Sequence, residues 1–248
     1  MVALVALVWG VISLVGLFSD APGPAGPGPG PSAPGVAGAG SGAAIEAALA
    51  RAPMPPVPAQ ASMPHALSMR SAGAPITLPQ PSRVAGTAVP IGFPAGEEGA
   101  LAQVAELTKV GMAGADPQVW AQAYAALAEP GAAPPDQTPL HRELVALRRS
   151  ANMPVTGTRD GMRLSWSPTA AMVKGRTDDG SYVVACVLGE LVADYQGRVV
   201  NAGWGNCLPM RRVGDQWRVA SGPAAWAAPA PWPGSDEAVA VGYRDIVR

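Results

Sequence analysis

The sequence has little charge and few of the side chains that build metal or redox centres. Among its 248 residues, 14% are charged and the net charge is -1. It contains two Cys and two His. A nucleic-acid-binding domain needs a basic surface to displace counterions from phosphates. We therefore expect no nucleic-acid partner for this chain.

The few potential ligands are poorly placed for a metal site. His65 lies in a Pro-rich stretch, and His141 stands beside Arg142 and Glu143 on a predicted helix. No His or Cys pair has the short spacing typical of zinc ligands. The sequence also lacks a nucleophile elbow, a Walker loop and a dinucleotide-binding fingerprint. We expect no metal, no cofactor and no enzymatic activity.

The chain begins with a long apolar run. Residues 2–18 contain no charged side chain, and as a helix this run is about 25 Å long, within the range of a membrane span. We expect residues 1–19 to be a retained anchor, with the rest of the chain outside the cytoplasm. One alternative is a signal peptide cleaved near the small residues 19–21, although Pro22 follows. Another is a buried helix of a soluble protein.

Residues 20–89 are rich in Pro, Gly and Ala. The whole of residues 1–69 carries three charged side chains, Asp20, Glu46 and Arg51. Pro removes helix hydrogen-bond donors and Gly raises the entropy cost of ordering, so this composition predicts a disordered linker and lead-in. The stretch AAIEAALAR within it is expected to form at most a transient helix.

Residues 90–222 have the pattern of a folded domain that begins with three helices. GEEGALAQVAEL has acids in its first turn, where they favour the helix dipole, and apolar residues at helical spacing. Asp116 followed by Pro117, and Thr138 followed by Pro139, are typical helix starts with an N-cap and proline at the first position. These signals predict helices in DPQVWAQAYAALAEP and TPLHRELVALRRS.

The hydrophobic period then changes to about two, which indicates strands. MRLSWS and AMVKGRT are expected to form a hairpin around SPTA, followed by the strands 182–195, 198–213 and 216–221. The predicted fold is α+β, a cone-shaped domain of about three helices on a curved four- to five-stranded antiparallel sheet. Residues 223–248 are expected to be a Pro/Trp-rich tail with a short helix capped by Ser235.

The two cysteines lie on predicted neighbouring strands. If the Gln-Gly pair at 196–197 forms a two-residue hairpin turn, continued pairing places Cys186 directly opposite Cys207. A disulfide there would close a loop of about 20 residues and contribute about 3 kcal/mol by the chain-entropy relation. Two buried reduced cysteines are the alternative, and a one-residue bulge near 203–205 would shift the register.

Four residues are candidates for protein contacts. Trp226 and Trp232 follow the last predicted strand of the domain in the segment AAWAAPAPWPGS. An exposed aromatic strip of this kind is typical of a docking surface. Arg211 and Arg212 precede a tight turn and are solvent-facing hairpin residues or part of the same contact surface.

A ligand pocket inside the cone is the alternative use of the domain. Glu190 lies in the middle of a predicted strand, on the same predicted face as Cys186. An enzyme of this type needs an inward-facing acid with a donor such as a Tyr nearby. Glu190 and Tyr182 are the pocket candidates for that reading.

The order of apolar anchor, Pro-rich spacer, helices and antiparallel strands resembles a known family. GFPAGEEGALAQVAEL, WSPTAAMVKG and WGNCLPMRRVGDQWRVASGP are similar to the cystatin-like cone fold of the nuclear transport factor superfamily. The resemblance is to the bitopic version of this fold found in conjugative type IV secretion machines of actinobacteria. Accessory membrane proteins of actinobacterial lipid-import systems look similar too.

This resemblance implies a single-pass membrane protein that acts as a non-catalytic scaffold of a conjugative, type IV secretion-like apparatus. It implies contacts of the extracytoplasmic domain with other envelope or secretion-channel proteins, and homo-oligomers. The alternatives are a small-ligand binder or an isomerase- or dehydratase-type enzyme that uses the cone pocket, and an accessory protein of a lipid-import system.

Overall fold

The domain is built on one sheet with helices on both faces. The computed structural model describes residues 42–84, 86 and 88–248. The strand order is β1-β6-β2-β3-β4-β5, with β1 and β6 parallel and the other pairs antiparallel. The strands are β1 (Ile76–Thr77), β2 (Met162–Arg176), β3 (Tyr182–Tyr195), β4 (Arg198–Val213), β5 (Gln216–Val219) and β6 (Arg244–Val247).

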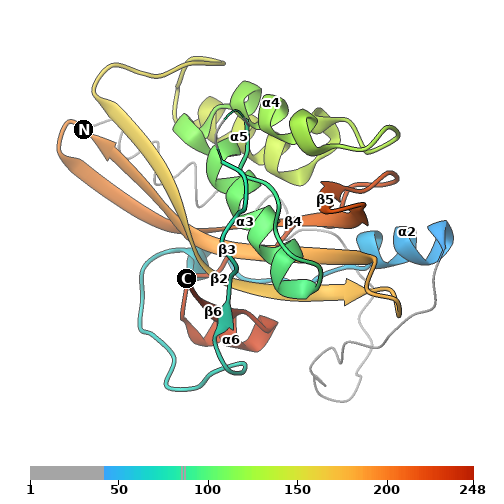
Figure 1. Cartoon of the computed structure of the whole chain (residues 1–248). Coiled ribbons are helices and arrows are strands. Elements are labelled where there is room, and N and C mark those ends of the chain that lie inside the picture. Colours follow the sequence, from blue (N-terminus) through green and yellow to red (C-terminus); the bar gives the residue numbers. More distant parts are fainter. Residues whose placement is uncertain (1–41, 85, 87) are drawn as a thin grey trace, which may run out of the picture.

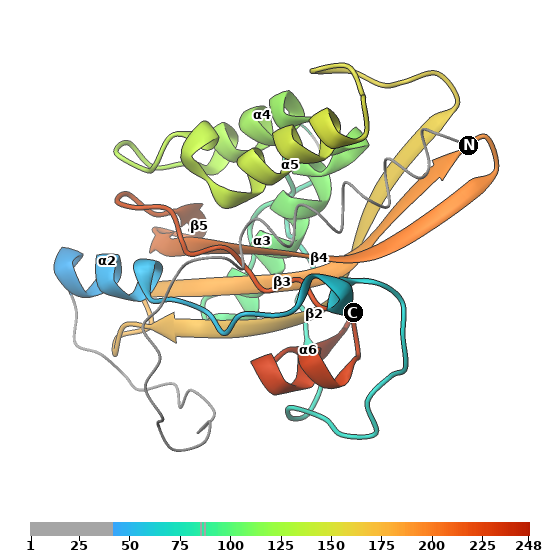
Figure 2. The ribbon, with the colours of Figure 1, turned by 180° about the vertical axis from the view of Figure 1, so that it is seen from behind.

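Three longer helices cover one face of the sheet and two shorter ones pack on the other. The front layer consists of α3 (Glu97–Gly111), α4 (Pro117–Leu127) and α5 (Pro139–Ser150), as Figure 1 shows. The opposite face carries α6 (Asp236–Val241), and α2 (Ala43–Arg51) lies at one end of the sheet (Figure 2). The arrangement is a curled mixed half-barrel, consistent with a cone or cystatin-like fold.

The helices expected from their start signals are confirmed. Asp116 caps α4 by accepting a hydrogen bond from the Gln118 N–H at 2.8 Å. Thr138 caps α5 through the His141 N–H at 3.4 Å. Each cap satisfies one of the N–H groups that a helix start leaves without an intrahelical partner. Almost every side of α3 is buried because α4 and the sheet enclose it.

The expected count of three helices and four or five strands is too low, and two strand assignments are corrected. Residues 162–176 form one continuous strand instead of a hairpin. Its pairing with β3 shifts register between Pro168 and Ala170 and between Val173 and Gly175, and the strand continues past the expected turn. The tail does not end as a helix. Gly242 adopts a left-handed φ of 107° that terminates α6, and the chain turns into β6.

The predicted β3–β4 register is confirmed along the whole hairpin. Pairing runs without a bulge from Tyr195–Arg198 to Tyr182–Arg211. The turn at 196–197 has positive φ at both central positions, 54° and 79°, as a type I′ turn requires. Cys186 and Cys207 face each other with 4.1 Å between their Cα atoms and form a disulfide. Reduced cysteines are therefore excluded in this structure.

The sheet separates two hydrophobic cores. The larger one lies under the front helices and includes the indoles of Trp120, Trp166 and Trp217. The smaller one lies on the back face around the disulfide, Tyr182 and Tyr243. The bridge is thus placed in the core covered by α6 and α2, because alternate strand residues point to opposite faces.

Helix α2 is firmly attached to the sheet, although only a transient helix was expected in this stretch. The Ala50 carbonyl at its C-terminal end accepts from Lys174 Nζ at 2.8 Å and from the Trp226 N–H at 2.8 Å. The Tyr182 hydroxyl donates to the Glu46 carbonyl at 3.0 Å. A nine-residue helix is not stable in water through its intrinsic propensity alone, so these tertiary contacts stabilise it.

Within the described residues, no helix combines the length and apolar character of a membrane span. The apolar run at 2–18, the basis of the expected anchor, lies outside them, as does the part of the predicted linker from residue 20 to 41.

The disulfide predicts a stability difference between the oxidised and the reduced protein. Reduction should lower the free energy of unfolding by about 3 kcal/mol, because the bridge restricts a loop of about 20 residues in the unfolded chain. Urea unfolding with and without reductant measures this. Cys186→Ala/Cys207→Ala should match the reduced protein and should not respond to reductant. Equal stability of the two redox forms would contradict the prediction.

The burial of Lys174 predicts how the stability of the fold changes with pH in the alkaline range. Burial lowers the pKa of Lys174 from 10.5 to about 8. Between these two values the unfolded chain binds more protons than the folded one, so this residue makes stability rise with pH across that window. Lys174→Met should remove the rise. Urea unfolding midpoints of the parent and of Lys174→Met, measured at pH 7.5 and pH 10, test this. Equal changes of the two midpoints between these pH values would contradict the prediction.

Candidate functional site

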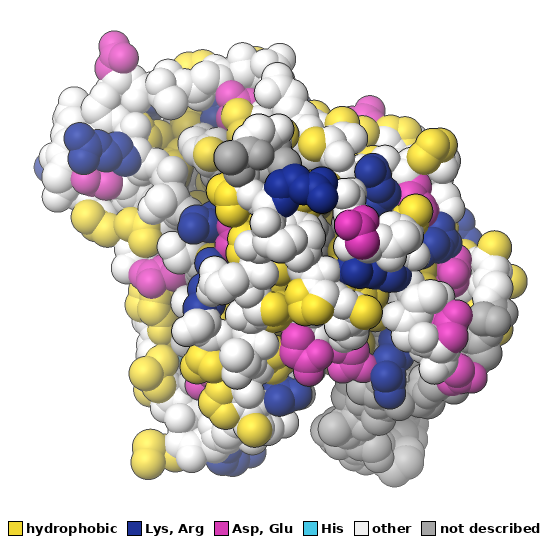
Figure 3. Space-filling view, in the orientation of Figure 1, with side chains coloured by type: hydrophobic (Ala, Val, Ile, Leu, Met, Phe, Trp, Pro, Cys, Tyr) yellow, Lys and Arg dark blue, Asp and Glu magenta, His cyan; other side chains and the backbone are white. Residues whose placement is uncertain are grey.

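The disulfide-bearing hairpin extends past the helical layer, together with the first half of β2. Figures 1 and 2 show this end of the strands projecting beyond the helices. Val199 near the tip is 58% exposed. Figure 3 shows basic and acidic side chains interspersed over this face of the molecule, without a large region of one sign. The projecting end is therefore suited to contacts with a mixed protein surface rather than to electrostatic capture of a polyanion.

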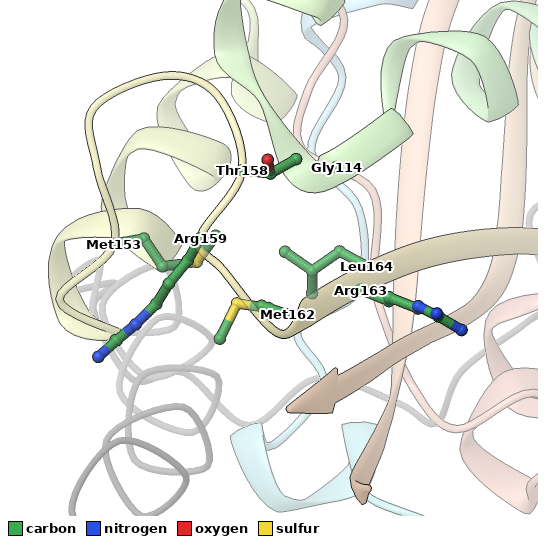
Figure 4. A pocket seen from close by; sticks show the side chains of 7 residues that line it. All are labelled: Gly114, Met153, Thr158, Arg159, Met162, Arg163 and Leu164. Carbon is green, nitrogen blue, oxygen red and sulfur yellow. The ribbon is translucent and has the colours of Figure 1, made fainter. Parts of the chain in front are cut away.

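A small pocket lies where the projecting strands meet the front layer. Its volume is about 260 Å³, and its walls are mainly Met153, Met162 and Leu164, with Thr158 and Gly114 on the opposite side (Figure 4). The stems of Arg159 and Arg163 complete the wall, and their guanidinium groups point away from the centre. Such an apolar lining can hold an apolar side chain or a small apolar ligand.

A buried arginine holds the loop that closes this pocket. Arg148 on α5 is 2% exposed. Its guanidinium donates to the carbonyl oxygens of Gly114 (3.1 Å), Ala115 (3.0 Å), Pro154 (2.7 Å) and Gly157. The Asp116 carboxylate accepts from the Gly157 N–H at 2.5 Å. Charge-assisted hydrogen bonds of this kind fix the loop 152–161 over the start of β2.

Glu143 has a carboxyl group whose pKa lies well above its ordinary value. This half-buried residue of α5 faces Trp204 of β4, and burial raises the pKa of Glu143 to about 7. The Trp204 indole and Arg142 act in the opposite direction. Trp204 Nε1 is itself buried and faces this carboxyl group. A carboxyl group that titrates near neutral pH is suited to proton transfer or to pH-dependent binding.

Arg211 and Arg212, expected as contact residues, direct their donors into the domain. Arg211 forms ion pairs with Glu46 and Glu129 and lies over the Tyr182 ring at 5.8 Å. Arg212 donates to the Phe93 carbonyl at 2.7 Å. Their role in partner binding stays a prediction, and their observed contacts join separate parts of the same chain.

The tail that carries the two tryptophans packs against the back of β4 between Ala228 and Trp232, and Trp226 lies next to α2. Trp226 is 47% exposed, whereas Trp232 is half-buried. The tail approaches the strand closely because Gly203 has no side chain: a Cβ there would lie 2.0 Å from the Pro231 carbonyl oxygen. Trp226 is therefore the more accessible of the two expected docking residues.

The structure does not bring the two pocket candidates together. Glu190 and Tyr182 are on the same face of β3, and their separation along the strand is about 26 Å at about 3.3 Å per residue. Tyr182 is buried against α2, and Glu190 lies half-buried between Ser167 and Gly203 on the neighbouring strands. Neither residue lines the pocket under loop 152–161.

Sequence reasoning identified neither this pocket nor the Glu143–Trp204 pair. The pocket depends on a loop conformation fixed by Arg148, and the sequence pattern of its helix does not indicate that this side chain is buried. In the sequence, Glu143 is only a charged neighbour of His141 on a predicted helix. Its position opposite Trp204 is a contact between distant segments that helix periodicity cannot indicate. The described residues contain no group of three or more His, Cys, Asp or Glu side chains placed to hold a metal ion.

Comparison with protein-family models, with curated proteins and with solved structures finds no match to this chain.

The raised pKa of Glu143 predicts how stability changes between acidic and neutral pH. The folded state holds this proton up to about pH 7, whereas the ordinary value is 4.5. The folded state therefore binds more protons than the unfolded one between these values, and stability falls as pH rises through the window. Glu143→Gln, which keeps the neutral shape, should be more stable than the parent at pH 8 by about 1–3 kcal/mol.

Urea unfolding at pH 5 and pH 8 measures the effect of Glu143→Gln. At pH 5 the two proteins should be nearly equal. Glu98→Gln, on the first turn of α3, is the matched control, and its difference from the parent should be similar at both pH values. A loss of stability in Glu143→Gln at pH 8 would contradict the assigned protonation.

Proposed function

We propose that this protein is a non-catalytic, membrane-anchored scaffold of the cell envelope whose folded domain lies outside the cytoplasm. The observation that carries the proposal is the Cys186–Cys207 disulfide between the two central strands. Disulfides form and persist in oxidising compartments and are rare in the cytosol. The apolar run at 2–18 supports the anchor, and the resemblance to conjugative type IV secretion scaffolds supports the kind of apparatus.

The surface of the domain favours protein contacts as its mode of action. Val155 and Val199 are 82% and 58% exposed, and Trp226 is 47% exposed. Exposed aliphatic and aromatic side chains on a rigid frame are typical anchors of protein interfaces. The pocket under loop 152–161 has room for an apolar side chain of a partner protein.

Co-purification tests the scaffold role. The full chain, tagged at its C-terminus, is isolated from membranes of its native host after mild cross-linking, and the associated proteins are identified by mass spectrometry. Secretion-channel or ATPase subunits are the expected partners. Trp226→Ala should reduce their recovery several-fold, with Val247→Ala as the control for another exposed apolar residue. Recovery of lipid-import subunits would assign the alternative pathway, and recovery of no partner would contradict the scaffold.

The location is tested separately. The intact protein is trapped with a thiol-alkylating reagent in whole cells and its mass is measured under non-reducing conditions. An unmodified, oxidised Cys186–Cys207 pair is expected. Two alkylated thiols would rule out the extracytoplasmic placement without affecting the result of the co-purification.

A small-ligand enzyme is the second candidate, because Glu143 has a carboxyl group that titrates near neutral pH beside the buried Trp204 indole. A general acid or base requires a group of this kind. Turnover of a small carbonyl compound that disappears in Glu143→Gln, with the fold intact, would favour this candidate.

A further inference from the structure

Residues 63–70, called the strap below, lie against the start of α6 (Figures 1 and 2). The chain is held on both sides of the strap. Before it, the Ala61 carbonyl accepts from the Trp232 N–H at 2.5 Å, and after it the Ala74 carbonyl accepts from Arg244 Nε at 2.6 Å. Between these two points no residue from 63 onward belongs to a helix or strand. The strap therefore has fixed ends and a middle that can open.

Polar contacts, and not apolar packing, hold the strap against α6. Leu67 is 66% exposed and Met69 is fully exposed. Ser68, between them, points inward: its N–H donates to the Gly234 carbonyl at 2.7 Å, and its hydroxyl donates to the Asp236 carboxylate at 2.5 Å. Apolar burial is the main stabilising term in folded proteins. A segment that lacks it opens more easily than the core and depends on its few polar contacts.

His65 makes the contact of the strap that depends on pH. Its Nδ1 lies 2.7 Å from the Met63 carbonyl oxygen, and its Nε2 lies 3.0 Å from a carboxylate oxygen of Glu237. A carbonyl and an ionised carboxylate only accept hydrogen bonds, so both ring nitrogens must donate. The protonated imidazolium has two N–H groups, whereas neutral imidazole has one. The geometry at His65 is therefore that of the charged form.

The charged groups that face His65 favour this proton. Glu237 is in direct contact, and Asp236 precedes it on the same helix. Arg70, the cation of the strap, is paired with Asp236 at 3.2 Å. The hydrogen bonds to Met63 and Glu237 raise the pKa of His65 above its ordinary value of 6.5. The stabilisation of the closed strap is therefore complete below pH 6.5 and is lost as pH rises through the raised pKa.

We propose that the strap is a pH-sensitive device: protonated His65 binds it to Glu237 of α6, and loss of this proton loosens it. Neutral His65 can keep its hydrogen bond to Met63, which lies within the strap, but then has no N–H left for Glu237. The contact that is lost is the one between the strap and the helix. The backbone hydrogen bond of Ser68 remains, so the strap opens more often while the rest of the domain stays folded. The device does not depend on the envelope role proposed above.

Hydrogen exchange of the Ser68 amide measures the opening, because this N–H is bonded to Gly234 only when the strap is closed. The full chain is exchanged in mild detergent at pH 5.5 and 8.5 and read at single residues by mass spectrometry, relative to an unstructured peptide at the same pH. Exposed ion pairs contribute little, so protection of Ser68 should be about two- to fivefold higher at pH 5.5. The Leu78 N–H, which donates to the Val247 carbonyl at 2.8 Å beyond the strap, should show no such difference.

Three variants separate the role of His65 from a merely structural one. His65→Gln and Glu237→Gln should each remove the difference between the two pH values. Arg70→Gln is the matched control, because the Arg70–Asp236 pair keeps its charges across this range. It should lower protection at both pH values by a similar factor and keep the difference.

Unfolding curves establish that each of these variants is folded. Equal protection of Ser68 in the parent at pH 5.5 and 8.5 would overturn the proposal. A pH difference of the parental size that persists in folded His65→Gln would also overturn it.

Discussion

The register of the β3–β4 hairpin determines the positions of most other parts of this domain. The turn at 196–197 needs two successive left-handed residues, and that geometry fixes every pair from Tyr195–Arg198 onward. A slip by one residue would move each side chain to the other face of the sheet. Trp204 would then leave the front core, and Cys207 could not reach Cys186. The disulfide holds this same register from the middle of the strands, so the turn and the bridge enforce one arrangement.

Glycines in the central strands allow distant segments to pack directly on the sheet. A Cβ on Gly189 would lie 2.6 Å from the Trp166 ring, which crosses β3 and donates to the Trp204 carbonyl at 3.0 Å. Gly203 leaves room for the tail on the opposite face. The indole on one side and the tail on the other thus replace the side chains that the strands lack. This explains how a sheet with many small residues still has two well-filled cores.

Local signals in the sequence predicted the parts of the fold that depend on neighbouring residues. Helix starts at Asp116 and Thr138 and the hairpin at 196–197 follow from capping and turn chemistry, and the cysteine pairing follows from counting along two strands. The continuous β2, strand β6 and the attached α2 could not be found in this way. Each depends on contacts between segments far apart in the chain. The same limit applies to the candidate sites, because Glu143 and Arg148 acquire their environments only in the assembled front layer.

The attachment of α2 connects the start of the described chain to the centre of the sheet. Arg211 binds Glu46 of α2 and Glu129 after α4, and it stacks on Tyr182. The side chains of both acids are at most 15% exposed, so removing the single cation would leave two buried carboxylates near each other. If the apolar run at 2–18 anchors the protein in a membrane, as proposed, α2 is the first described element that follows it. Its contacts with β3 and β4 then fix where the chain enters the domain, at the end of the sheet opposite the projecting hairpin (Figure 2).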